Sequence, residues 1–154
     1  MPAPRSDPVP RPPEPDHLPG PSAPSRRTAG ILLIIFPTVV IGGVSVLTLL
    51  ITDPAYAANP LRQDLWRAGH AHAGVLVSLG LIVQLFADAV TLGGPVAAIA
   101  RSGVPLAAIL IPAGYFLSSA GRGATEPNRL IVLIYVGAVS LAMGVLALGV
   151  GLLA

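Results

Sequence analysis

The chain contains no cysteine and no lysine, and only 10% of its 154 residues are charged. Without cysteine it has no disulfide, no thiolate metal site and no cysteine nucleophile. The nine arginines are too few and too scattered to form a nucleic-acid-binding surface, so nucleic acid is not an expected partner. A soluble domain carries about 25% charged residues, and this chain therefore lacks the polar surface of a soluble protein.

Apolar sequence dominates instead, at 53% of the residues with a mean hydropathy of +0.77. It is concentrated in four stretches, at residues 31–51, 68–90, 104–120 and 130–153. A helix that rises 1.5 Å per residue needs about 20 residues to cross a bilayer core of ~30 Å. The third stretch is shorter and contains Pro112, but neighbouring helices can satisfy the backbone groups that a proline frees. Short connections then predict an all-α fold, a membrane-embedded antiparallel four-helix bundle.

Residues 1–27 are rich in proline and charge, which predicts a disordered tail ahead of a transmembrane domain at residues 28–154. The first apolar stretch is too long for the apolar region of a signal peptide, although "PAYAA" at 54–58 resembles a cleavage site. Arg26 and Arg27 beside the first stretch favour a cytoplasmic N-terminus. Four spans would place the C-terminus on the same side, in a multi-pass protein of the cell membrane with the lipid bilayer as its partner.

The stretch "RAGHAHAGVLVSLG" at residues 67–80 places two histidines at the start of the second span. At about 100° per residue, His70 shares one helix face with Gly74, Val77, Leu81, Gln84 and Asp88. His72 lies about 200° away on the same wheel, among apolar residues. Two ligands on one helix must be three or four residues apart to share an ion. These two histidines are therefore not expected to hold one metal, and no metal site is predicted.

Alternating topology brings the end of the first span, the start of the second, the end of the third and the start of the fourth to one face of the membrane. Most of the polar side chains belong to this face, and we expect a binding pocket there formed by Arg67, His70, Tyr115 and Ser119. Asp88, near the opposite face, is expected to be solvated at the headgroups, and His72 to reach headgroups or a neighbouring protomer. Trp66 is expected to anchor the membrane interface.

His70 is the best candidate for a functional residue, because an ionisable group in a span is costly and histidine titrates near neutrality. An interfacial histidine that bonds a backbone carbonyl or a loop carboxylate remains the alternative. No cofactor is predicted. A haem bound by a single histidine, or shared between two protomers, stays open as a further alternative. A His70–Met143 pair within one chain is disfavoured, because the two residues lie at depths that differ by about 15–20 Å at 1.5 Å per residue.

Small residues recur along the fourth span at Gly137, Ser140, Gly144, Ala147 and Gly151. Such residues let helices approach closely in lipid, where burial of apolar side chains gives no driving force. This stripe is predicted to be a packing face. It permits a homo-oligomer or a membrane protein partner without requiring either.

The segments "NPLRQDLWRAGHAHAGVLVSLG" and "GATEPNRLIVLIYVGAVSLAMGVLALGVGLL" resemble small bacterial integral membrane proteins with four predicted spans and no assigned activity. The resemblance covers about residues 28–154. A fainter likeness is to the hydroxylaminobenzene mutase family, in which a Gly-His pair opens an apolar helix followed by Gly and Leu. The matching residues are Gly69, His70, Gly74 and Leu76. This likeness implies a cofactor-free isomerase of small aromatic hydroxylamines, and it bears on His70 alone.

Two functions follow from the sequence. The first is a non-enzymatic membrane subunit or binding protein with a polar, histidine-containing pocket at one end of the bundle, favoured because no paired carboxylates or phosphate-binding loop is present. The alternative is a small intramembrane enzyme or redox-linked protein in which His70 acts as acid-base or ligand, assisted by Tyr115 and Arg67. Transport would require several protomers to enclose a path.

Overall fold

The computed structural model of the protein describes residues 20–121 and 123–154. Within them there is no strand, and four long helices form the molecule: α1 (Ala23–Thr52), α3 (Pro60–Phe86), α4 (Gly94–Ser118) and α5 (Val132–Leu153). A short helix, α2 (Pro54–Ala57), and a 3-10 turn, η1 (Arg129–Ile131), lie in the connections. The four long segments are each long and apolar enough to cross a membrane. The prediction of an all-α helical bundle is confirmed, and the four apolar helices indicate a multi-pass membrane protein.

Three helices begin earlier than the apolar stretches suggested: α1 and α3 have an additional first turn with a side-chain cap, and α4 begins at Gly94 without one. Ser22 caps α1 by accepting a hydrogen bond from the Ser25 amide, so residues 23–27 are helical and not part of a tail. Asn59 caps α3 in the same way, and both α3 and α4 have a proline in the first turn, where its missing N–H costs nothing. The rest of the predicted tail, residues 1–19, lies outside the described residues.

The helix ends also differ from the prediction. The second span stops at Phe86, and residues 87–90 turn away from it, whereas the third begins at Gly94 and ends at Ser118. The predicted loop over residues 91–103 is therefore mostly helix.

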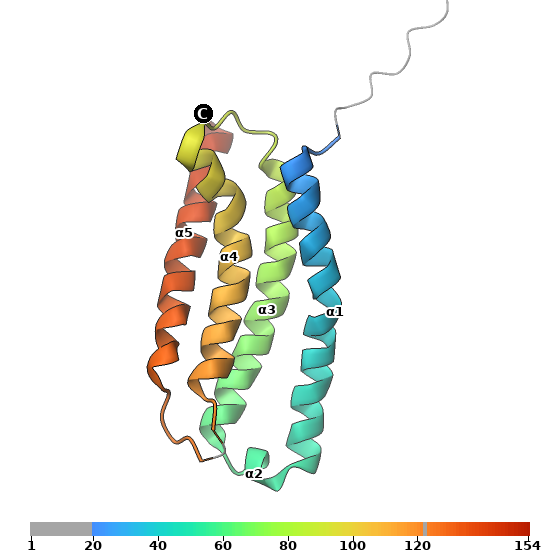
Figure 1. Cartoon of the computed structure of the whole chain (residues 1–154), viewed down its shortest axis with the longest axis vertical. Helices are drawn as coiled ribbons and strands as arrows, with labels where there is room; N and C mark the ends of the chain where they lie inside the picture. Colours follow the sequence, from blue (N-terminus) through green and yellow to red (C-terminus); the bar gives the residue numbers. More distant parts are fainter. Residues whose placement is uncertain (1–19, 122) are drawn as a thin grey trace, which may run out of the picture.

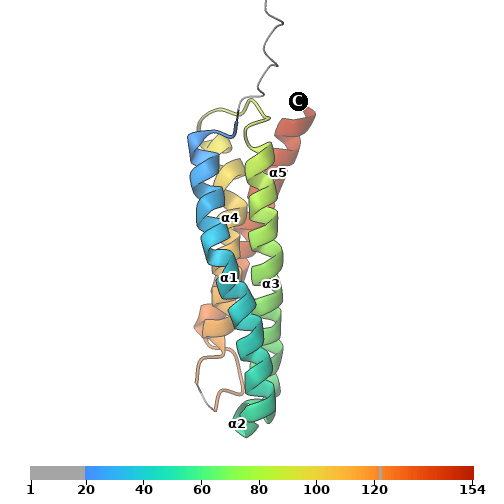
Figure 2. The same cartoon turned by 90° about the vertical axis from the view of Figure 1, so that its right-hand side faces the viewer.

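The long helices pack in the order α1, α3, α4, α5, with α3 and α4 in the middle and α1 and α5 outside (Figures 1 and 2). The start of α1 and the end of α5 lie at the same end of the molecule (Figure 1). One core cluster lies between the inner helices and α1 and contains Leu32, Leu76, Val77, Ala107 and Ile111. A second lies between the inner helices and α5 and contains Val83, Ala100, Val104 and Leu148.

The α4–α5 interface is a contact of backbone on backbone. A Cβ built on Gly103 would lie 2.7 Å from both the Gly144 Cα and the Ser140 carbonyl oxygen. The Ser140 hydroxyl donates to the Gly103 carbonyl at 2.9 Å. Gly137 meets Ile111 of α4 in the same manner. The prediction that the small residues of the last span form a packing face is confirmed at these positions.

Candidate functional site

His70 lies in the interface between α3 and α1, where α1 carries two consecutive glycines. A Cβ built on Gly43 would lie 2.8 Å from both Cε1 and Nε2 of the imidazole, and one on Gly42 would lie 3.8 Å from Nδ1. The missing side chain of Gly43 thus creates the space that the ring occupies, whereas a Cβ on Gly42 would make only an ordinary contact. One turn further along α3, Gly74 contacts Val39. The face of α3 predicted from the helical wheel is therefore the face that packs on α1.

A cavity of about 260 Å³ surrounds the imidazole, between α1, α3 and α4. Its walls are apolar apart from His70 and Thr38, and include Val39, Ala73 and Phe116. It adjoins a larger space of about 530 Å³ between α1 and α4, and the two share the lining residues Ile35, Val77, Ala108 and Ile109. We call the combined space the α1–α4 groove. It runs from Gly42 and His70 at one end to Thr28, Arg101 and Ser102 at the other.

Few polar groups line the cavity around His70, and two of them lack their usual hydrogen-bond partners. Within the described part of the chain, the His70 ring forms no hydrogen bond, and the Thr38 hydroxyl is already used by the Ile35 carbonyl at 2.7 Å. Pro112 has no N–H to donate to the carbonyl of Ala108, four residues earlier, which lines both parts of the groove. The mainly apolar cavity around His70 thus contains one imidazole and one helical carbonyl that lacks its usual N–H donor.

The four predicted pocket residues do not converge. Arg67 forms an exposed ion pair with Asp64 at 3.2 Å. Ser119 is fully buried and accepts a hydrogen bond from Trp66 Nε1 at 2.9 Å. Tyr115 lies against His72, and its ring centroid is 5.0 Å from that of the imidazole. Of the four, His70 alone lines the groove.

The two histidines point to opposite sides of α3, as the wheel predicted. His70 faces α1, whereas His72 lies beside Tyr115 of α4 and places Nδ1 2.7 Å from the Ala68 carbonyl. His72 is exposed and has these two partners within the chain; its contact with headgroups or a neighbouring protomer stays a prediction.

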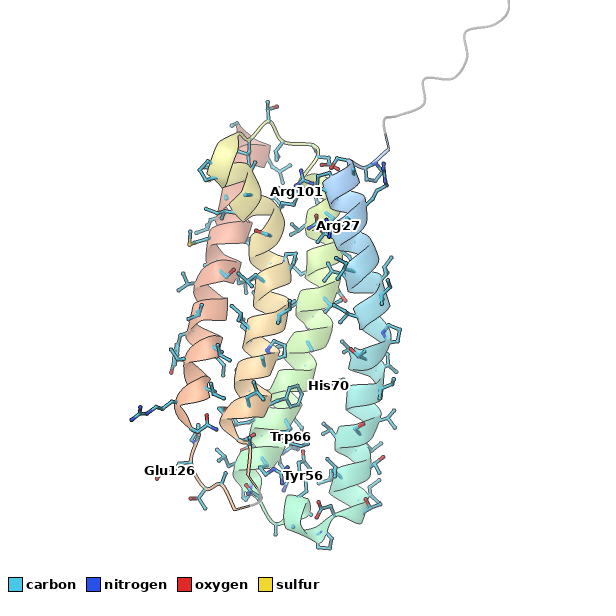
Figure 3. All side chains as sticks on the ribbon, viewed as in Figure 1. Arg27, Tyr56, Trp66, His70, Arg101 and Glu126 are labelled. Atoms are coloured by element: carbon cyan, nitrogen blue, oxygen red, sulfur yellow. The ribbon has the colours of Figure 1, made fainter. Side chains whose placement is uncertain are left out.

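An aromatic cluster closes the end of the molecule near α2 (Figure 3). Trp66 packs against Tyr56 and Phe116 with ring centroids 5.6 and 5.8 Å apart, and the Arg62 guanidinium lies 4.6 Å above the Trp66 ring. Burial raises the pKa of Tyr56, despite the opposing effect of the nearby arginines. Trp66 is thus part of a packed cluster with a bonded N–H, in addition to its expected place near the interface.

The opposite end carries a polar network that the sequence analysis missed. Asp88 accepts hydrogen bonds from the Ser22 backbone N–H at 2.8 Å and from its hydroxyl at 2.7 Å, and pairs with Arg101 at 3.0 Å. Arg101 also bonds the hydroxyl of Ser25. Asp88 is therefore held by partners from α1 and α4, not simply solvated as expected. Although partial desolvation raises its pKa, the hydrogen bonds from Ser22, Ser25 and Arg101 outweigh this and lower the pKa of Asp88.

A proline explains the position of Gln84 beside this network. Pro105 lacks the N–H that would bond the Arg101 carbonyl, and Gln84 Nε2 donates to that carbonyl at 3.0 Å instead. Gln84 is 2% exposed, so its burial in an apolar helix interface follows from satisfying this freed carbonyl.

Candidate metal and haem ligands lie apart from one another in the part of the chain that the structure describes. The described residues include no group of three or more histidine, cysteine, aspartate or glutamate side chains that could hold a metal ion. Met143 is 48% exposed on α5, whereas His70 packs on α1.

No family model, no curated protein and no solved structure matches this chain. The function must therefore be argued from the groove and its residues.

The sequence analysis found His70 but missed what surrounds it. Gly43 and Phe116, which touch the ring or its cavity, received no role. The consecutive pair Gly42-Gly43 inside an apolar helix was a readable signal, because two adjacent glycines weaken a helix unless something large packs on them.

Proposed function

We propose that the protein is a non-enzymatic membrane binding protein that holds a lipid-soluble, amphipathic molecule in the α1–α4 groove. The observation that carries the proposal is His70, a polar ring without a hydrogen bond in an otherwise apolar space. A polar group in hydrocarbon needs a partner, and a ligand with a hydrogen-bonding head supplies one. The apolar walls of the larger space take the ligand's tail.

The protein acts in the cell membrane as a multi-pass protein, with both termini in the cytoplasm. Arg26, Arg27 and Arg101 then lie at the cytoplasmic end, in agreement with the preference of arginine for that side. This end carries Arg27 and Arg101 in Figure 3, and His70 lies toward the other end of the bundle. The groove therefore extends from the cytoplasmic leaflet toward the opposite one.

The proposal favours binding over acid-base catalysis because the residues invoked for catalysis lie elsewhere. Tyr115 contacts His72, and Arg67 contacts Asp64. A proton transfer at His70 would have to proceed without either of them.

The test is a comparison of the lipids that co-purify with four forms of the protein, extracted in polymer-bounded lipid discs and identified by mass spectrometry. Ile109 is 60% exposed and lines both parts of the groove, so Ile109→Trp fills the groove without overpacking the core. Val139→Trp adds the same bulk at a 59% exposed position of α5 and serves as the control.

We expect one class of amphipathic molecule to be enriched in the wild type and in Val139→Trp, and to be depleted at least threefold in Ile109→Trp and in His70→Ala. An identical lipid composition in all four forms would exclude a ligand in the groove.

A further inference from the structure

Resting on the proposed binding function, we infer that the ligand class is a membrane quinone, with its ring beside His70 and its apolar chain along the α1–α4 groove. The inference concerns binding of the quinone or quinol as a stable ligand, with no electron transfer.

The shape of the cavity around His70 favours a flat head. Beside the imidazole the wall has two small residues, Gly42 of α1 and Ala73 of α3, among larger ones such as Ile35, Val39 and Val77. The Phe116 ring forms part of the wall from α4. Flat rings pack well against an aromatic side chain, whereas a glycerol-based headgroup is bulky and branched. The cavity of about 260 Å³ is also less than half the size of the adjoining space.

The charge of the cavity favours a neutral head. No aspartate, glutamate or arginine is among the residues that line the cavity around His70. Arg101, at the far end of the groove, is already engaged by Asp88 and Ser25. An anionic phosphate or carboxylate head would therefore be desolvated at the His70 end without an arginine to pair with, which is costly. A quinone is neutral in both its oxidised form and its quinol form.

The polar groups at the His70 end of the groove match the two forms of such a ring. A neutral imidazole has one N–H donor and one acceptor nitrogen, so His70 can donate to a quinone carbonyl or accept from a quinol hydroxyl. The Ala108 carbonyl, deprived of its usual helical donor by Pro112, can accept from a quinol hydroxyl. A purely hydrocarbon ligand would leave both groups without a hydrogen-bond partner.

The larger part of the groove matches an extended apolar chain. Its walls are mainly aliphatic, including Ile31, Leu32, Leu106 and Ile109. From Thr28 to Gly42 the groove follows 14 positions of α1, which correspond to about 21 Å at 1.5 Å per residue. This length accommodates a prenyl or alkyl chain of several repeating units, which runs toward the end that contains Arg101.

Trp66 makes the inference directly testable, because it is the only tryptophan in the chain and lies 5.8 Å from the Phe116 ring that lines the cavity. Quinones quench tryptophan fluorescence at short range. The experiment titrates the full-length protein in lipid nanodiscs with a decyl-substituted benzoquinone and follows Trp66 emission. His72→Ala is the matched control, since His72 is two residues away and faces α4.

We expect saturable quenching in the wild type and in His72→Ala, with affinity about tenfold lower in His70→Ala, the loss that one strong hydrogen bond in an apolar site produces. His70→Gln, which keeps a donor and an acceptor, should bind with intermediate affinity, and this variant also guards against a folding defect in His70→Ala. Decyl alcohol, which has the chain but not the ring, should compete at least tenfold less well than the quinone.

Linear, non-saturating quenching that is the same in all four forms would overturn the quinone assignment. Equal competition by decyl alcohol would overturn it as well, because the groove would then recognise only the chain. In both cases the lipids that co-purify with the protein distinguish a wrong ligand class from a groove that binds nothing. If one class of lipid is depleted in Ile109→Trp, the groove binds a ligand other than a quinone.

Discussion

The two outer helices, α1 and α5, are both apolar along their length, yet they attach to the inner pair in opposite ways. α5 lies directly on α4, where Gly103 and Gly144 bring the two backbones into contact. α1 is held by side chains instead: by Asp88 and Arg101 at its N-terminus, and by His70 beside Gly43 further along. Backbone contact leaves no space between helices, whereas contact through side chains leaves the α1–α4 groove.

The two interfaces therefore differ in what they contribute, one mainly to stability and the other mainly to binding. A close glycine interface is stiff, because backbone atoms cannot move aside to admit a larger residue. The α1 side contains the empty volume, the unpaired imidazole and the ion pair. We therefore expect substitutions at the α4–α5 interface to affect stability most, and substitutions on the α1 side to affect binding more than stability.

The largest effect should come from Gly144→Val. A Cβ at this position would lie 2.9 Å from the Gly103 Cα and 3.1 Å from the Val104 backbone nitrogen, so the helices must separate. Overpacking of this kind costs about 3 kcal/mol of the free energy of unfolding, at the upper end of the usual range. Thermal unfolding in detergent measures the loss. Gly149→Val is the control on the same helix, because nothing lies within 4 Å of its Cβ; equal melting temperatures for the two variants would mean that the close contact does not stabilise the fold.

The next largest effect should come from Asp88→Ala. The substitution removes the carboxylate that accepts two hydrogen bonds from Ser22 and pairs with Arg101. The side chains of Asp88 and Arg101 are each 25% exposed. Loss of a charged hydrogen-bond partner costs about 1–2 kcal/mol. Hydrogen exchange should show faster opening of the first turn of α1, at residues 23–27.

Asp64→Ala is the matched control for that experiment. It breaks an ion pair of Arg67 between two side chains that are 57% and 75% exposed, and such pairs contribute little. If α1 amides exchanged equally fast in both variants, the network at Asp88 would not be what holds the N-terminus of α1.

The third effect is a dependence on pH. Because the folded protein holds the pKa of Asp88 below its ordinary value of about 3.9, the carboxylate stabilises the fold above about pH 4 and loses this contribution as the pH falls toward the lowered pKa. The difference in melting temperature between wild type and Asp88→Asn should be constant from about pH 5 to 8 and shrink below about pH 4. A difference that instead grew on acidification would show the opposite linkage.

The smallest effect on stability should come from Gly43→Ala. Its Cβ would lie 2.8 Å from the far end of the His70 side chain, which can rotate away. The control is Gly30→Ala on the same helix, because nothing lies within 4 Å of a Cβ there. The melting temperatures of the two variants should therefore be similar. Both variants gain the same helix propensity. Quinone affinity should nevertheless fall severalfold in Gly43→Ala alone, because the displaced ring no longer occupies its position in the cavity. Unchanged affinity would argue against a role of His70 in binding.

Sequence reasoning succeeded where one residue type fixes the outcome. The small residues of the last span predicted a packing face, and Gly137 and Gly144 provide it. The helical wheel placed His70 and His72 on opposite sides of α3, and they lie there. It failed for Tyr115 and Ser119, which were grouped with His70 by their depth in the membrane although they face other neighbours. Depth follows from counting residues, but the neighbour of a side chain depends on which helices pack together.

The sequence by itself determined that the protein is a helical membrane protein with four spans, because apolar length and scarce charge leave the backbone no other way to satisfy its hydrogen bonds in lipid. It also determined the faces of the helices, through the period of 3.6 residues. Only the tertiary structure decided that α1 packs on α3 and hardly contacts α4. It also decided that Asp88 accepts hydrogen bonds from Ser22 and that the His70 ring packs against Gly43. These contacts join residues far apart in the chain, and no local pattern specifies which helix becomes the neighbour of which.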